Sequence, residues 1–422
     1  MPVPAGTGLS RRSFMLRSGA LALSVYGASQ IDALGLAEGV AAAAEAPPNA
    51  VLVSVFLDGG IDSMSILAPT GDSRYAAQRP TLKVTESESL SFSEDPGLRW
   101  HPSAASLREL HGEGKLTVLP AIGYSDPNQS HFTSRHFYEV GGLQSDERTG
   151  WMGRFLDQTG SPDNPLQGLA LDGYLAPTLA TSAKPVAAID GPRYDLYADG
   201  VSGEVGDAMY ERFPRLGALY ATSGGAMGVA GSAALQSGRV RERMLPFMTG
   251  GLGTRVNYPG GEFSNKLAAL AAILDEGLPV RCAAVRGTGE HDTHANQDED
   301  FSRDLRNISD ALLAFQRDLE DRGQANRVIV QVWSEFGRRV EENGSRGTDH
   351  GAAGIGFLMG NRVRGQMVGE FPGLASLDPD GNLRATSDFR AVYCSLLEQW
   401  FDTDAGAVIP GASGFGRPAL VS

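Results

Sequence analysis

The sequence is poor in cysteine and in basic side chains. Its two cysteines, Cys282 and Cys394, lie in an apolar strand-like and an apolar helix-like segment, so we predict two buried thiols and not one disulfide. Lysine and arginine total 36 against 50 acidic residues, which gives a formal net charge of -14. Phosphates repel such a surface, and no basic, aromatic-rich patch appears, so we expect no nucleic-acid partner.

The sequence also lacks an apolar run long enough to cross a bilayer. The apolar stretch at residues 19–25 is soon interrupted by Tyr26, Gln30 and Asp32. A helical span needs roughly 20 consecutive apolar residues. We therefore predict no transmembrane anchor in the mature chain.

The N-terminal residues have the layout of a twin-arginine signal. Residues 10–15 read Ser-Arg-Arg-Ser-Phe-Met and precede the short apolar stretch, while small residues at 42–44 suit a signal peptidase. We predict a signal peptide and linker over residues 1–46, export by the twin-arginine translocase, and a periplasmic or secreted mature protein. The alternative is an ordinary amphipathic helix that carries two arginines by chance.

Strand and helix patterns alternate along the rest of the chain. Continuous apolar runs favour buried strands at 51–57, 116–122, 280–285 and 328–333, and helical periodicity appears at 301–319 and 389–401. This order predicts an α/β fold: a doubly wound, mostly parallel sheet with helices on both faces, in which those four strands are parallel neighbours. We expect one domain over residues 47–422, with a loop-rich insertion or cap over 163–262.

Acidic and imidazole side chains follow the strand patterns directly. The loops after parallel strands share one edge of a sheet, and four of the seven histidines fall in such loops. Carboxylate oxygen and neutral imidazole nitrogen are ligands of divalent metals, which promote displacement at phosphorus. A sulfate ester poses a similar problem. We therefore expect a metal site whose ligands are Asp62, Asp292, His294, Glu335, Asp349 and His350.

Several of these residues have a structural alternative. Asp62 and Asp349 could cap the segments that follow them, and His291 competes with His294. Glu335 is followed by two arginines and could pair with one of them. His131, at the start of a predicted helix, is expected to contact an anionic substrate, because a helix N-terminus favours anions.

Five separated motifs resemble a known family. In order they are FLDGGID at 56–62, SHF at 130–132, DTHANQ at 292–297, SEFGR at 334–338 and GTDHG at 347–351. They resemble the bacterial family called domain of unknown function 1501, whose members commonly carry twin-arginine leaders. That family in turn looks like a distant branch of the alkaline phosphatase and sulfatase superfamily, so the resemblance implies an alkaline-phosphatase-like fold.

The superfamily pattern implies roles for individual residues. Asp62 matches the early ligand, Asp292 and His294 the middle set, and Asp349 and His350 the later pair. The implied nucleophile is Ser130, at the better helix-capping position, or Ser125, whose surroundings are loosely similar to the sulfatase motif. Cys394 lies inside an apolar helix pattern, so a formylglycine sulfatase is not expected.

The histidine count limits the metal that the resemblance implies. No histidine follows His350, and one residue separates Asp292 from His294, so a complete two-zinc centre is not expected. One zinc, calcium, magnesium or manganese ion fits the same residues. The resulting hypothesis is a secreted metal-dependent hydrolase of phosphate or sulfate esters from the envelope or polysaccharide. The alternative is a non-catalytic envelope binding or assembly protein that retains the fold.

Overall fold

The computed structural model describes residues 25–26, 49–191 and 203–422. The paired arginines and the rest of the predicted signal lie outside the described residues, apart from Val25–Tyr26 (β1), which pairs with a strand at the edge of the main sheet. Among the described residues, no helix is both long enough and apolar enough to cross a membrane.

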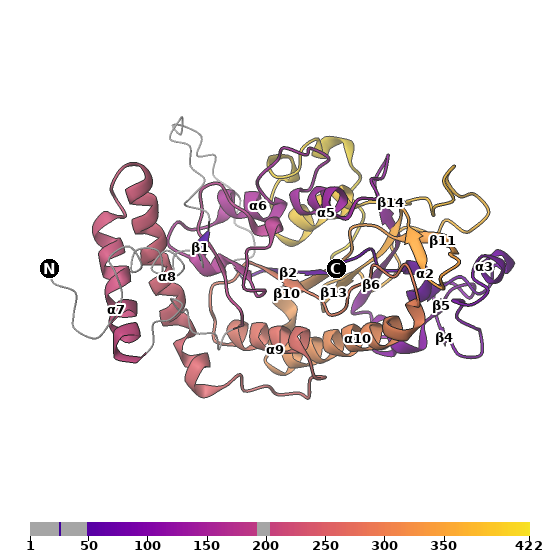
Figure 1. The fold of residues 1–422 in the computed structure, drawn as a ribbon, viewed down its shortest axis with the longest axis horizontal. Coiled ribbons are helices and arrows are strands. Elements are labelled where there is room, and N and C mark those ends of the chain that lie inside the picture. The colour runs from indigo at the N-terminus through magenta and orange to yellow at the C-terminus, as the bar shows by residue number, and fades with distance from the viewer. Residues whose placement is uncertain (1–24, 27–48, 192–202) are drawn as a thin grey trace.

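One sheet runs through the middle of the molecule (Figure 1). Its strand order is β1-β8-β7-β9-β2-β10-β13-β6-β14. The strands after β1 are β2 (Val51–Phe56), β6 (Leu116–Gly123), β7 (Gly168–Ala170), β8 (Val186–Ala188), β9 (Cys282–Arg286), β10 (Val328–Trp333), β13 (Gly354–Met359) and β14 (Ser387–Asp388). The five strands β8, β7, β9, β2 and β10 are successive parallel neighbours, which confirms the mostly parallel sheet.

The expectation that β6 is a direct neighbour of these parallel strands was wrong. The structure places β13 between β10 and β6, antiparallel to both, so that β6 shares the direction of β10 without touching it. Residues 334–353, which join β10 to β13, contain no helix to carry the chain back across the sheet. The chain therefore returns antiparallel.

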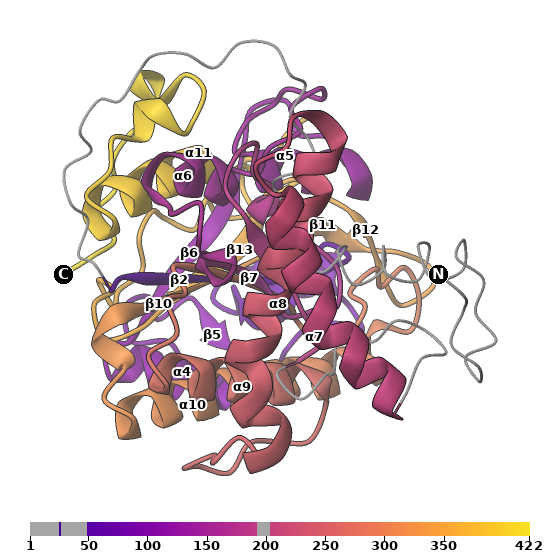
Figure 2. The same cartoon turned by 90° about the vertical axis from the view of Figure 1, so that its left-hand side faces the viewer.

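Helices cover both faces of the sheet, as predicted. Beneath it in Figure 2 lie α4 (Ala105–Gly112), α9 (Glu262–Asp275) and α10 (Gln297–Asp321), and above it lie α5 (His131–Val140), α6 (Trp151–Thr159) and α11 (Phe389–Ser395). Alternate residues of β2 face the two layers: Val53 packs with the lower helices and Leu52 with the upper ones. Burial on both faces explains why β2 reads as a continuous apolar run.

The described residues within 163–262, namely 163–191 and 203–262, do not all lie outside the main sheet as a cap. They supply β7 and β8 to the main sheet, and only then the helices α7 (Gly203–Tyr220) and α8 (Gly225–Gly250), which pair at one end of the molecule (Figures 1 and 2). The prediction of an insertion was wrong for the strands, because each has three residues and is too short to show a period.

Smaller elements complete the fold. They are α2 (Ser63–Ile66), α3 (Ser73–Gln78), a sheet of β3 (Leu67–Ala68), β5 (Arg99–Trp100) and β4 (Leu90–Ser91), the hairpin of β11 (Arg338–Glu342) and β12 (Thr348–His350), the 3-10 turns Pro102–Ala104, Pro165–Gln167, Pro177–Leu179, Ala325–Arg327, Ala405–Ala407 and Ala412–Gly414, and a π turn at Leu396–Trp400. Both cysteines are free and buried, as expected from their apolar surroundings.

Candidate metal centre

Four separated segments meet at the edge where the parallel strands end. The loop after β9 brings Asp292 and His294, the first residue of α5 is His131, and β12 ends at His350. The loop after β10 brings Glu335. His350 reaches this edge because β13, the strand that follows it, runs antiparallel and therefore starts here.

The ligand atoms of His131, Asp292 and His350 all lie within 4.8 Å of one another. His350 Nε2 is 3.0 Å from Asp292 Oδ1 and 3.0 Å from His131 Nε2, and His131 Nε2 is 3.4 Å from Asp292 Oδ1. His294 stands beside this set, with its Nε2 3.0 Å from both His350 Nε2 and Asp292 Oδ1. We call these four residues the histidine cluster.

The other ring nitrogen of each histidine faces an oxygen acceptor. His131 Nδ1 is 2.8 Å from Glu335 Oε1, His294 Nδ1 is 3.1 Å from Asp349 Oδ1, and His350 Nδ1 is 2.8 Å from the backbone oxygen of Gln129. Each Nδ1 must therefore carry the hydrogen, which leaves each Nε2 of a neutral ring as a bare lone pair. Three lone pairs and a carboxylate oxygen then point together, an arrangement that repels unless a cation compensates it.

The spacing of these atoms fits a divalent ion. Zinc binds imidazole nitrogen at about 2.0 to 2.1 Å, so two ligand atoms of a tetrahedral site are about 3.3 Å apart. The three distances among His131, Asp292 and His350, 3.0 to 3.4 Å, are close to this value. Imidazole nitrogen with one carboxylate suits zinc and other transition metals, whereas calcium and magnesium prefer oxygen alone.

Glu335 orients His131 from a fully buried position. Its two carboxylate oxygens accept hydrogen bonds from the amides of Gly59, at 3.0 Å, and Gly60, at 3.1 Å. Burial acts to raise the pKa of Glu335, but the hydrogen bonds from His131 and Gly59 outweigh it and hold the pKa below its usual value. The same hydrogen bond with Glu335 raises the pKa of His131.

The Gly59-Gly60 turn requires glycine. Both residues have positive φ, +105° and +70°, and a Cβ on Gly60 would collide with the ring of Phe336. Phe336 in turn packs under two rings of the histidine cluster, with its centroid 4.8 Å from that of His131 and 4.9 Å from that of His350. The turn therefore presents two amides to Glu335 and leaves room for the aromatic floor.

Arg338 ties the surrounding loops together. Its guanidinium is fully buried and donates to the backbone oxygens of Gly60, at 2.7 Å, and Thr348, at 2.8 Å, and to Asp292 Oδ1 at 2.7 Å. Burial acts to raise the pKa of Asp292, but Arg338 outweighs it and lowers this pKa to about 2. Asp292 is thus a fixed anion at neutral pH.

Asp62 does not reach the histidine cluster. It is buried and forms an ion pair with Arg79, and it also accepts hydrogen bonds from Ser65 Oγ and Gln297 Nε2, each at 2.6 Å. Gln297 Oε1 accepts from Thr348 Oγ1 at 2.7 Å, so Asp62 supports the β11–β12 hairpin from a distance. The placement contradicts the expectation that Asp62 is a metal ligand.

Several other residues expected at the metal site or the substrate lie in positions that differ from the prediction. Glu335 and Asp349 touch the Nδ1 atoms of two histidines and do not enter the shared space of the Nε2 atoms. His131, expected to contact substrate, lies among the ligand atoms. His291 is buried beneath them, with a pKa lowered by burial, so His294 and not His291 occupies the site.

The two serines proposed as nucleophiles are exposed. Ser125 lies in the loop after β6, and Ser130 occupies the N-cap position of α5. The side chain of Ser130 makes no capping hydrogen bond, contrary to the capping role expected from sequence. Its hydroxyl thus stays available next to His131.

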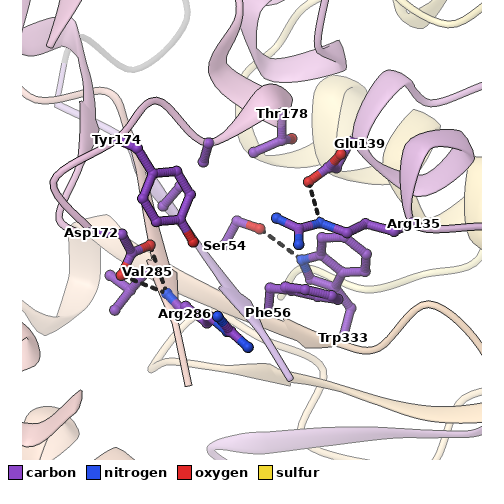
Figure 3. A pocket seen from close by; sticks show the side chains of 12 residues that line it. Ser54, Phe56, Arg135, Glu139, Asp172, Tyr174, Thr178, Val285, Arg286 and Trp333 are labelled. Atoms are coloured by element: carbon purple, nitrogen blue, oxygen red, sulfur yellow. Dashed lines mark hydrogen bonds and ion pairs between the residues drawn. The ribbon is translucent and has the colours of Figure 1, made fainter. Parts of the chain in front are cut away.

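A pocket lies on the same edge beside α5 (Figure 3). Arg135, one helical turn after His131, donates to Glu139 at 2.8 Å, while Arg286 at the end of β9 donates its backbone N–H to Asp172 at 2.9 Å. Tyr174, Asp172 and Arg286 also line an adjoining cavity of about 280 Å³. No local sequence pattern indicates these cavities, because their walls come from six separated segments: 54–56, 135–139, 172–178, 262–266, 284–289 and Trp333.

Comparison with known proteins confirms the resemblance stated above for part of the chain. Residues 257–397 match the family described as "Protein of unknown function (DUF1501)", a stretch that contains Asp292, His294, Glu335, Asp349 and His350 but not His131. No curated protein sequence matches the chain.

Three solved structures match most of the chain at low identity and low TM-score. A protein in the alkaline phosphatase superfamily from Vibrio parahaemolyticus is 10% identical, with a TM-score of 0.36 over 94% of this chain and 76% of that one. The C-terminal periplasmic domain of EcEptC from Escherichia coli, in complex with Zn, is 10% identical, with a TM-score of 0.39 over 89% and 91%. The PsFucS1 sulfatase from Pseudoalteromonas sp. is 11% identical, with a TM-score of 0.37 over 98% and 78%.

Proposed function

We propose that this chain is an exported, metal-dependent hydrolase of phosphate or sulfate esters. The proposal is carried by one observation, the convergence of three imidazole Nε2 atoms and the Asp292 carboxylate while the Nδ1 atoms are already hydrogen-bonded. His131, Asp292 and His350 would hold a single ion, with His294 as the fourth ligand. The nitrogen-rich donor set favours zinc, or another metal that prefers imidazole such as copper, iron or nickel, over calcium, magnesium or manganese.

The ion would polarise an ester oxygen and offset negative charge that develops during displacement. The N-terminus of α5 supplies the remaining anion-binding chemistry. Its first amides have no intrahelical acceptors and Ser130 does not cap them, so they are free to bind the oxygens of an anionic ester. Ser130 Oγ, at the same helix end, is the proposed nucleophile, in preference to Ser125.

Two arginines near the site, Arg338 and Arg135, are not proposed to bind the reacting ester group. Arg338 donates to Asp292 and to four backbone oxygens, so it orients a ligand and does not contact substrate. Arg135 lies one turn along α5 from His131, about 6 Å farther along the helix axis, and lines the pocket beside α5. The adjoining cavity of about 280 Å³ would accommodate the part of the substrate that does not react.

The test uses the natively exported protein. We expect about one transition-metal ion per chain by elemental analysis, and turnover of p-nitrophenyl phosphate or p-nitrophenyl sulfate. His350→Ala and Asp292→Ala should lose both the metal and the turnover, whereas His136→Ala should lose neither, because His136 hydrogen-bonds to the backbone oxygen of Gln144 and is not part of the histidine cluster. A wild-type protein without metal would overturn the proposal.

The non-catalytic alternative is favoured if Ser130, whose side chain makes no capping hydrogen bond, is not a nucleophile. An envelope binding protein would keep the metal but show no turnover, and Ser130→Ala would then change neither property. For a hydrolase, Ser130→Ala should abolish turnover while the bound metal is retained. Measuring metal content and turnover on this variant separates the two functions.

A further inference from the structure

The hairpin of α7 and α8 concentrates exposed apolar side chains. Large apolar side chains that are exposed among the described residues are Phe132, Tyr174, Val205, Leu216, Leu219, Tyr220, Met227 and Leu245, and the last six lie on this hairpin. Four of them gather around the turn that joins the helices. We call residues 216–231 the hairpin tip.

The apolar residues of the hairpin tip face the same way on α7. Leu216, Leu219 and Tyr220 have the i, i+3, i+4 spacing of one helical face and are 49%, 74% and 42% exposed. Met227, in the first turn of α8, is 57% exposed. These four side chains therefore form one apolar end of the hairpin.

The hairpin tip carries no charged residues, and the first charged residues outside it are basic. Residues 216–238 contain no Asp, Glu, Lys, Arg or His. The nearest charged residues on α7 are Arg212 and Arg215, and both are exposed. Each lies four residues before an apolar residue of the tip and therefore on the same helical face, about 6 Å farther from the turn. On α8 the first charged residue is Arg239, which pairs with Asp163 and does not add to the charge at the tip. A chain with a net charge of -14 thus presents basic side chains next to its apolar tip.

The two helices are held close together behind the tip. A Cβ on Gly217 would meet the backbone oxygen of Gly231 and the side chain of Ala234, so only glycine allows this approach. α8 in turn packs against the body of the protein, near the start of β7. The apolar tip is therefore presented by a braced pair of helices at one end of the molecule (Figures 1 and 2).

We propose that the hairpin tip docks into the surface of an anionic phospholipid bilayer. Leu219, Met227 and the ring of Tyr220 would enter the interface between headgroups and acyl chains, a layer about 5 to 10 Å deep, which matches the 6 Å between the apolar face and the arginines. Arg212 and Arg215 would then lie at the level of the lipid phosphates and bind them.

A deformable lipid surface suits this tip better than a protein partner does. A specific protein interface buries roughly 1,200 to 2,000 Å² of well-packed surface. The tip instead offers four large side chains spaced by small residues, among them Gly224, Gly225 and Gly228. Lipid chains can close around such side chains without a preformed complementary surface.

The test measures co-sedimentation of the full chain with vesicles. We expect binding to vesicles that contain phosphatidylglycerol, weaker binding to vesicles of phosphatidylcholine alone, and weaker binding in high salt. Leu219→Ser with Met227→Ser should reduce binding by tenfold or more. Arg212→Gln with Arg215→Gln should reduce it by about fivefold for each arginine on the anionic vesicles.

Leu245→Ser is the matched control. Leu245 is 39% exposed on the same helix pair but lies 18 residues beyond Met227, about 27 Å along α8, so its replacement should leave binding unchanged. Equal binding by all variants, or no binding to anionic vesicles, overturns the proposal. So does a dimer of the wild type that Leu219→Ser and Met227→Ser dissociate, since the tip would then contact a second copy.

Discussion

Glu335 Oε1 lies 2.8 Å from His131 Nδ1, although 204 residues separate the two in sequence. The contact joins the end of β10 to the start of α5 and fixes which nitrogen of His131 faces the histidine cluster. A carboxylate behind a metal-binding histidine raises the basicity of the ring and holds its orientation. Glu335 is therefore a positioning residue.

Replacing Glu335 by Gln should weaken metal binding by about 10- to 100-fold, because the ring loses its anionic partner while the side chain keeps its shape. Metal affinity can be measured by competition with a chromophoric chelator. Glu139→Gln is the control, since Glu139 is a buried carboxylate on α5 that pairs with Arg135 and does not touch the histidine cluster. Equal losses in both variants would contradict the positioning role.

Replacing Asp62 by Ala should destabilise the fold by about 3 to 5 kcal/mol, because it leaves Arg79 buried without its partner. The metal content of the folded variant should match the wild type, because Asp62 does not reach the histidine cluster. Glu398→Ala, which breaks an exposed pair with Arg417, should cost less than about 1 kcal/mol. Urea unfolding and elemental analysis check both expectations.

The Asp62–Arg79 pair should also give stability a defined pH dependence. Burial acts to raise the pKa of Asp62, but Arg79 and the hydrogen bonds outweigh it, so the folded-state pKa lies below the usual value. The contribution is therefore complete above the unfolded pKa of about 3.9 and is lost as pH falls through the lower folded value. The difference in unfolding free energy between wild type and Asp62→Asn should be constant from pH 7 to about 5 and should shrink below about 4.

Cys282 and Cys394 should not react with thiol reagents in the folded protein, because both are buried and burial raises the pKa of each thiol. Labelling with a maleimide should proceed only in denaturant and should then modify both. A reducing agent should leave the melting temperature unchanged. A melting temperature that falls under reducing conditions would indicate a disulfide.

Export should depend on the paired arginines at positions 11 and 12. Changing both to lysine should leave precursor in the cytoplasm, because the twin-arginine translocase reads this pair. Fractionation with an antibody to the mature chain gives the result. Continued appearance of the wild-type protein outside the cytoplasm in a strain without that translocase would exclude this route.

The sequence predicts the central strands well because they are buried on both faces. β2, β9 and β10 are each a short, mostly apolar run rich in β-branched or small residues, with at most one polar or charged residue. β7 and β8 escaped detection because three residues show no period, and the position of β13 depends on which edge of the sheet the returning chain meets. Tertiary packing determines where β13 inserts, and no local sequence pattern indicates it.

For the candidate site, the position of a residue after a predicted strand indicated which residues lie near one another. Residue type alone did not indicate which of them are ligands. Asp292, His294 and His350 were singled out because they follow strand patterns or lie between glycines, and they do lie together. Asp62 satisfies the same criteria, yet Arg79 neutralises it. An acid 17 residues before an arginine carries no sign of that pairing, because the contact depends on how α3 folds back over the loop.

The central position of β2 constrains when the protein can fold. Val53 pairs with Ala283 on one side and Val330 on the other, so the middle of the sheet cannot close until most of the chain has been synthesised. Pairings between such distant residues raise the contact order and slow folding. β2 therefore stays unpaired, with its apolar side chains exposed, until its C-terminal partner strands have been synthesised. A ribosome-bound nascent chain should consequently depend on chaperones that shield β2, and the histidine cluster should be among the last parts of the molecule to assemble.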